Sequence, residues 1–154
     1  MSDTAKFTHT IFQYQKQNNM NEDFIPFELA VKLKEKGFRK PCVATYDKDG
    51  MLGYNYYQPK SIKAVSFDDC LCISDDLVLA PTISQVLKWL REEKLILIGL
   101  SPMQEYGGDE VVEWCATVYK ADKQGGLSWK EEYYYQSYEQ AALAGIEYVL
   151  DNLI

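Results

Sequence analysis

The sequence predicts an α+β fold, in which three helices pack mainly on one face of an antiparallel sheet. Apolar residues recur at helical spacing in three segments with recognisable ends, and shorter alternating segments with turn sequences lie between them. Of the 154 residues, 47% are hydrophobic and 25% charged, which is typical of a globular protein with one core. We therefore expect one domain over residues 23–154, preceded by an arm at residues 1–22.

The three helices are expected at residues 26–36, 82–94 and 137–153. The first begins at a proline, which suits the first helical position, and is followed by Gly37, which favours the left-handed conformation that ends a helix. Thr82 and Gln85 form a capping-box pair at the start of the second helix, and Ser137 and Gln140 repeat it at the third.

Strands are expected at residues 42–46, 51–57, 95–100, 111–120 and 127–135. The turn 47–50 joins the first two strands into a hairpin, and the turn 122–126 joins the last two. Residues 95–100 are apolar on both faces, which predicts a central strand. The sheet is thus expected to contain two hairpins and this central strand. Weaker strand patterns occur at residues 61–74 and, within the arm, at residues 7–14.

The chain offers few residues for common site chemistries. His9 is the only histidine and lies in the arm, which disfavours a triad that needs histidine as a base. Cys70 and Cys72 are one residue apart with no second matching pair, so alternating strand cysteines are a better explanation than a zinc site. We therefore expect no cofactor, no metal and no catalytic residue.

Charge and hydropathy limit the partners. The formal net charge of −7 disfavours binding to a nucleic-acid backbone, which depends on Lys and Arg. No apolar run reaches the ~20 residues needed to cross a bilayer, and the N-terminus lacks a secretion signal. The sequence thus predicts a cytoplasmic protein without a membrane segment.

Twelve tyrosines, against six phenylalanines, are the main pointer to function. Strand alternation places Tyr54 and Tyr56 on one side of the first hairpin, and Tyr133 and Tyr135 on one side of the second, with Trp129 beside them. These rings either complete the core or form an aromatic platform on the sheet face that the helices leave uncovered. Trp89, on the second helix, either borders the core or anchors a partner.

Three segments also resemble a known group of proteins. These are residues 26–42, residues 80–94, and the Ser137-Tyr138-Glu139 start of the last helix with Ala141 and Leu150. Together they resemble an uncharacterised family of small hypothetical proteins from gut bacteroidetes, their phages and mobile elements. The similarity covers residues 22–154 and implies an accessory protein of a phage or mobile element, with no catalytic residue to carry over.

These observations leave three hypotheses. The first is a non-enzymatic binding module that engages a protein partner through the tyrosine-rich surface or through Trp89. The second is a binder of a small molecule, such as a nucleotide-like signal, by stacking on aromatic rings. The third is an enzyme of unknown type. An uncovered sheet edge or face is also compatible with a homodimer.

Overall fold

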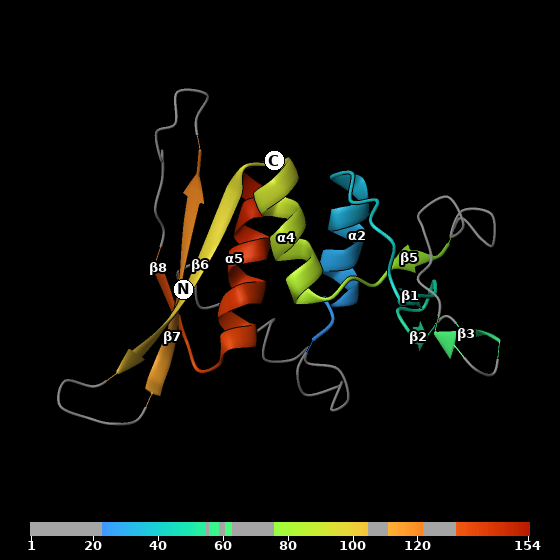
Figure 1. Ribbon diagram of the computed structural model, residues 1–154, viewed down its shortest axis with the longest axis horizontal. Coiled ribbons are helices and arrows are strands. Elements are labelled where there is room, and N and C mark those ends of the chain that lie inside the picture. The colour runs from blue at the N-terminus through green and yellow to red at the C-terminus, as the bar shows by residue number, and fades with distance from the viewer. Residues whose placement is uncertain (1–22, 55, 59–60, 63–75, 105–110, 122–131) are drawn as a thin grey trace.

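The computed structural model describes residues 23–54, 56–58, 61–62, 76–104, 111–121 and 132–154. The arm at residues 1–22, with its expected strand at 7–14, lies outside the described residues, as does most of 61–74. Within the described part, three helices lie between two three-stranded antiparallel sheets (Figure 1). The α+β class is therefore confirmed.

The helices are α2 (Phe27–Glu35), α4 (Ile83–Glu93) and α5 (Tyr138–Asn152). One sheet has the order β2-β1-β5, formed by β1 (Ala44–Tyr46), β2 (Leu52–Tyr54) and β5 (Val78–Leu79). The other has the order β6-β7-β8, formed by β6 (Ile96–Gln104), β7 (Val111–Lys120) and β8 (Glu132–Tyr135). A separate pair joins β3 (Tyr56–Gln58) to β4 (Ser61–Ile62).

Local capping explains why the helices begin and end where the sequence predicts. The Thr82 hydroxyl accepts from the Gln85 backbone N–H at 3.2 Å, and Gln85 Oε1 accepts from the Thr82 N–H at 3.0 Å. The Ser137 hydroxyl accepts from the Gln140 N–H in the same way at 3.2 Å. After α2, Gly37 has a φ of +89°, a conformation that glycine adopts without steric cost.

The prediction of one sheet is wrong. Both predicted hairpins form, since β1 pairs with β2 and β7 pairs with β8, but they belong to different sheets. The short strand β5 completes the first sheet by pairing with β1. Because each sheet covers a different side of the helical layer, the helices bury apolar surface in both directions, which a one-sided arrangement would not allow.

The strand expected at the centre of the sheet is an edge strand. Among the described residues, β6 pairs with β7 only, and β7 lies in the middle. The strand also continues beyond the predicted end at residue 100 to Gln104, and it includes Pro102. Proline has no N–H to donate to a second neighbour, so its presence fits an edge position.

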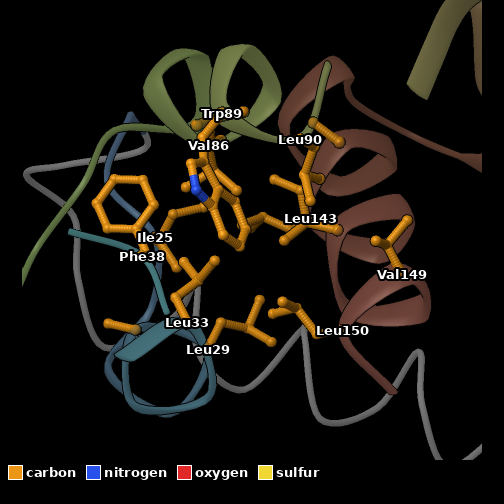
Figure 2. Packing of buried hydrophobic residues seen from close by; sticks show 14 of the residues in the cluster. Ile25, Leu29, Leu33, Phe38, Val86, Trp89, Leu90, Leu143, Val149 and Leu150 are labelled. Carbon is orange, nitrogen blue, oxygen red and sulfur yellow. The ribbon is translucent and has the colours of Figure 1, made fainter. Parts of the chain in front are cut away.

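The main core lies among the three helices (Figure 2). Phe38 and Trp89 meet edge to face with ring centroids 5.5 Å apart, and both are at most 2% exposed. Figure 2 shows Leu33 from α2, Val86 and Leu90 from α4, and side chains of α5 converging on the same space. Burial of each such side chain contributes ~1.5–3 kcal/mol.

Candidate functional site

The structure separates the tyrosines that the sequence analysis grouped together. Tyr54 and Tyr56 belong to β2 and β3, whereas Tyr133 and Tyr135 belong to β8, at the opposite end of the molecule (Figure 1). These four residues therefore do not share one sheet face. Trp129 lies outside the described residues, as do the side chains of Tyr54, Tyr56 and Tyr133.

Tyr135 lies on the face of its sheet that the helices cover. Its side chain is 8% exposed and packs in a cluster with Ala116 of β7 and with Ala141 and Ala144 of α5. These alanines let the helix approach the sheet closely enough to enclose the ring. The predicted alternation along β8 is confirmed, but its uncovered side is the one that carries Tyr134, which is 52% exposed.

Trp89 is a core residue, which is the first of the two alternatives that helical spacing left open. Its side chain is 1% exposed, and its indole N–H donates to Glu93 Oε2 at 2.9 Å. Lys94 Nζ lies 5.0 Å from the ring centroid. Helical spacing predicts an inner face of Ile83, Val86, Leu87 and Leu90 for this segment, but the helix turns so that Trp89 is buried and Leu87 is only partly covered.

A better candidate is the face of the sheet β6-β7-β8 that no described helix or strand covers, which we call the open face. In Figure 1 the helices lie on the other side of this sheet, where Ile96, Ile98, Ala116 and Val118 are buried. Side chains alternate along each strand, so the intervening positions form the open face. It consists of Leu97, Gly99, Ser101 and Met103 of β6, Glu113, Cys115, Thr117 and Tyr119 of β7, and Tyr134 of β8.

Strand register sets the neighbours on this face. Leu97 is opposite Tyr119, and Ser101 is opposite Cys115, which in turn is opposite Tyr134. Leu97 is 46% exposed and Met103 41%, so two aliphatic side chains and the Tyr134 ring face solvent on the same sheet surface. Single exposed apolar residues are common on protein surfaces and need no explanation. Several apolar side chains exposed on one face more often indicate an interaction surface than single ones do.

Two local contacts occur on the open face. A Cβ atom added at Gly99 would stand 3.4 Å from Cε2 of Tyr119, so the tyrosine ring lies against the glycine. Cys115 is 7% exposed, and its thiol lies 3.8 Å from the Thr117 hydroxyl. The thiol is therefore buried, although its residue lies on the open face.

Alternation along residues 111–120 predicts Glu113, Cys115, Thr117 and Tyr119 on one side of this strand, and the structure places them on one face. The same reasoning does not find Leu97, because residues 95–100 are expected to be apolar on both faces, or Met103, because the strand is expected to end at residue 100. Gly99 and Ser101 were the available signal, since small and polar residues at every second position indicate a half-exposed strand.

A cleft lies elsewhere, where α4 and α5 begin. Its volume is about 290 Å³, and it is lined by Asp23, Thr82, Ile83, Ser84, Tyr138 and Glu139. The Ile83 N–H already donates to the Asp23 carbonyl at 2.8 Å, and the helix caps occupy further first-turn donors. A phosphate placed there would face two carboxylates, so the cleft offers little support for a nucleotide site.

The described ranges hold no cluster of three or more His, Cys, Asp or Glu side chains arranged for a metal ion. None of the helices found in those ranges combines the length and hydropathy needed to cross a bilayer. No protein-family model matches the chain, and neither the curated proteins nor the solved structures include a match.

Proposed function

We propose that the chain is a non-enzymatic binding module that engages a protein partner through the open face. The observation that carries this proposal is the exposure of Leu97, Met103 and Tyr134 on one face of one sheet. Leu97 and Met103 lie at the two ends of β6, and Tyr134 lies across the sheet, so the apolar groups span a broad area.

The composition of the open face fits a protein surface better than a small ligand. Aromatic and methionine side chains are enriched where proteins meet, and charged residues are depleted at the centre of such contacts. In the interior rows of the open face, Gly99, Ser101, Cys115 and Thr117 are small and uncharged. Glu113 lies toward one end of β7, where a polar rim is expected.

Site-specific photo-crosslinking tests the proposal. A photoreactive phenylalanine analogue in place of Tyr134, in cells that naturally make the chain, should yield a discrete adduct with another protein. The same analogue at Arg91, which is exposed on α4, is the matched control. It should give no such adduct, because α4 lies on the other side of the sheet from the open face.

The adduct must also depend on the apolar groups around the probe. Leu97→Ser and Met103→Ser together should reduce its yield at least tenfold while the far-UV circular dichroism spectrum stays unchanged. An adduct that forms equally from Arg91, or that survives both serine substitutions, would show that the open face is not the contact surface.

A further inference from the structure

The outer edge of β6 carries main-chain groups that point away from its sheet. The Ala121 N–H donates to the Leu95 carbonyl at 3.0 Å, and the register continues from this pair along β6 and β7. In an antiparallel pair, every second residue bonds to the neighbouring strand. Leu97, Gly99 and Ser101 therefore bond to β7, while the N–H and C=O groups of Ile98 and Leu100 point outward.

The position of Pro102 agrees with this assignment. Pro102 is opposite Trp114 and lies two residues after Leu100 and four after Ile98, so its main-chain groups point to the same outer side as theirs. Its missing N–H would have pointed to the outer edge, so β7 loses no hydrogen bond. Among the described residues, no other main-chain or side-chain group bonds to the outward groups of Ile98 or Leu100.

The sequence of β6 contains little of the usual protection against strand pairing. Proteins commonly place lysine or another charged residue on an exposed edge strand. β6 has the sequence ILIGLSPMQ, which contains no charged residue over nine positions, and Pro102 near its end is the one blocking residue. The segment from Ile96 to Leu100 is thus an uncharged edge with β-branched and aliphatic side chains.

We propose that a second copy of this chain pairs with β6 along this edge, antiparallel and about a two-fold axis at Gly99. Ile98 then faces Leu100 of the second copy, and the two residues exchange both N–H···O bonds, as does the symmetric pair. The two Gly99 residues meet at the axis as a non-bonded pair, where the strands approach most closely.

The geometry of the edge favours a second copy, because the outward groups of Ile98 and Leu100 are complementary to the same groups of another β6 related by a two-fold axis. The formal net charge of −7 on each chain opposes association. β6 itself is uncharged, so pairing at this edge places no like charges opposite each other. The pairing joins two sheets into one and makes the two open faces continuous.

Sedimentation equilibrium on the full chain tests the pairing, with a matched pair of variants at one position. Leu100→Pro removes the outward N–H and spares the bonds to β7, whereas Leu100→Ala keeps the N–H and removes a similar amount of side chain. The wild type and Leu100→Ala should dimerise. Leu100→Pro should weaken dimerisation about 30-fold, because each dimer loses two main-chain hydrogen bonds.

A cysteine crosslink gives an independent readout if Leu100→Pro does not fold. Gly99→Cys places two thiols across the proposed axis, within the Cα separation that a disulfide needs. It should form a disulfide dimer under mild oxidation, while Met103→Cys, on the same strand but far from its own copy, should not. A monomeric wild type, a Leu100→Pro dimer of unchanged affinity, or equal crosslinking at both positions would overturn the proposal.

This pairing does not depend on the proposed function. The photo-crosslinking experiment at Tyr134 reports a different protein on the open face, and sedimentation reports self-association at the edge. A failure of one therefore leaves the other result interpretable.

Discussion

At the scale of single residues, Leu95 has a φ of +56°, in the left-handed region that glycine usually occupies. It follows Lys94, the residue that ends α4, and its side chain is 60% exposed. A left-handed conformation costs a residue with a Cβ roughly 1–2 kcal/mol, and the exposed side chain recovers little of this by packing.

We therefore expect Leu95→Gly to raise the free energy of unfolding by about 0.5–1 kcal/mol, after subtracting the extra flexibility of glycine in the unfolded chain. Urea denaturation measures the change. Leu97→Gly is the control, because Leu97 lies in a regular strand and its replacement should lower stability. A Leu95→Gly protein no more stable than the wild type would contradict the prediction.

Tyr46 supports the segment that precedes α2. Its hydroxyl donates to the Ile25 carbonyl at 2.7 Å, and burial raises the pKa of this tyrosine to about 12. Tyr46→Phe leaves that carbonyl without its donor and should lower the free energy of unfolding by ~1–3 kcal/mol at neutral pH.

The raised pKa adds a second, pH-dependent expectation for Tyr46→Phe. The folded state holds the Tyr46 proton more tightly than the unfolded chain does, so the wild type loses stability as pH rises from about 10 to about 12. Urea denaturation across this range should show a smaller loss for the phenylalanine variant. Identical alkaline profiles would contradict this assignment.

The sequence reveals the spacing of residues better than the side on which they are buried. Both Leu87 and Trp89 are compatible with an inner face that contains Val86 and Leu90, because helical spacing tolerates either. Likewise, alternation separates Tyr134 from Tyr135 but does not say which of them faces the helices. That choice is made by long-range packing, here by the small residues of α5.

At the scale of elements, α5 is enclosed on almost all sides. It contacts all three strands of the C-terminal sheet, and on its other side it contacts α4 and α2. Helical spacing predicts one buried stripe for this helix, formed by Ala141, Ala142, Gly145, Ile146, Val149 and Leu153. The contacts on both sides explain why Leu143, Ala144 and Leu150 are buried as well. A helix between two layers needs apolar residues around most of its circumference.

Gly145 is the point of closest approach between α5 and the sheet. A Cβ atom there would lie 2.8 Å from Cγ2 of Ile98 and 3.8 Å from the Cβ of Ala116. The Ile98 methyl is attached at a branched Cβ in a buried position, so it has little freedom to move. The small residues Ala141, Ala142 and Gly145 predict close packing of this helix on a sheet, and the contact at Gly145 confirms the prediction.

Gly145→Ala should therefore lower the free energy of unfolding by about 1–2 kcal/mol, although alanine is the better helix former by ~1 kcal/mol. Chemical denaturation should show this loss in the wild-type background. In an Ile98→Ala background the clash is absent, and the same substitution should become neutral or stabilising. Stabilisation in both backgrounds would contradict the close approach.

The ends of elements were more predictable than their pairing. Helix caps depend on residues three or four positions apart, and all three helices begin and end within a residue or two of the expected positions. Sheet order depends on residues far apart in the chain. The pattern at residues 95–100 carries no information about how many neighbours the strand has, and it therefore suggested a central position for an edge strand.

At the scale of the whole molecule, an ionic group links the first helix to the last. Lys32 of α2 contacts Asp151 at 2.8 Å and Glu147 at 3.4 Å, both on α5. Burial acts to lower the pKa of Lys32, but the Asp151 hydrogen bond and the two carboxylate charges raise it overall. For Glu147, burial raises the pKa and outweighs the attraction of Lys32, since the lysine lies closer to Asp151.

Glu28, which lies on the same helix as Lys32, is a second glutamate whose pKa is raised in the folded state. Burial and the charge of Glu147 together raise the pKa of Glu28. Both glutamates therefore bind protons more tightly in the folded state than in the unfolded chain, whose glutamates titrate near 4.5. Between neutral pH and pH 4.5 the folded state therefore holds more protons than the unfolded chain. As pH falls through this interval, the contribution of these two glutamates to the free energy of unfolding rises.

Glu147→Gln removes the titrating group but leaves Asp151 to pair with Lys32. Its stability relative to the wild type should thus be highest near pH 7 and should fall as pH is lowered to 4.5, where the wild-type carboxyl becomes neutral. Thermal or urea denaturation of both proteins across this range measures the difference. Glu113→Gln is the matched control, since it removes one exposed carboxylate without contacting Lys32. A Glu147→Gln difference that is constant with pH, or that grows toward acid, would show that burial does not dominate at this position and that the link between α2 and α5 is an ordinary attractive pair.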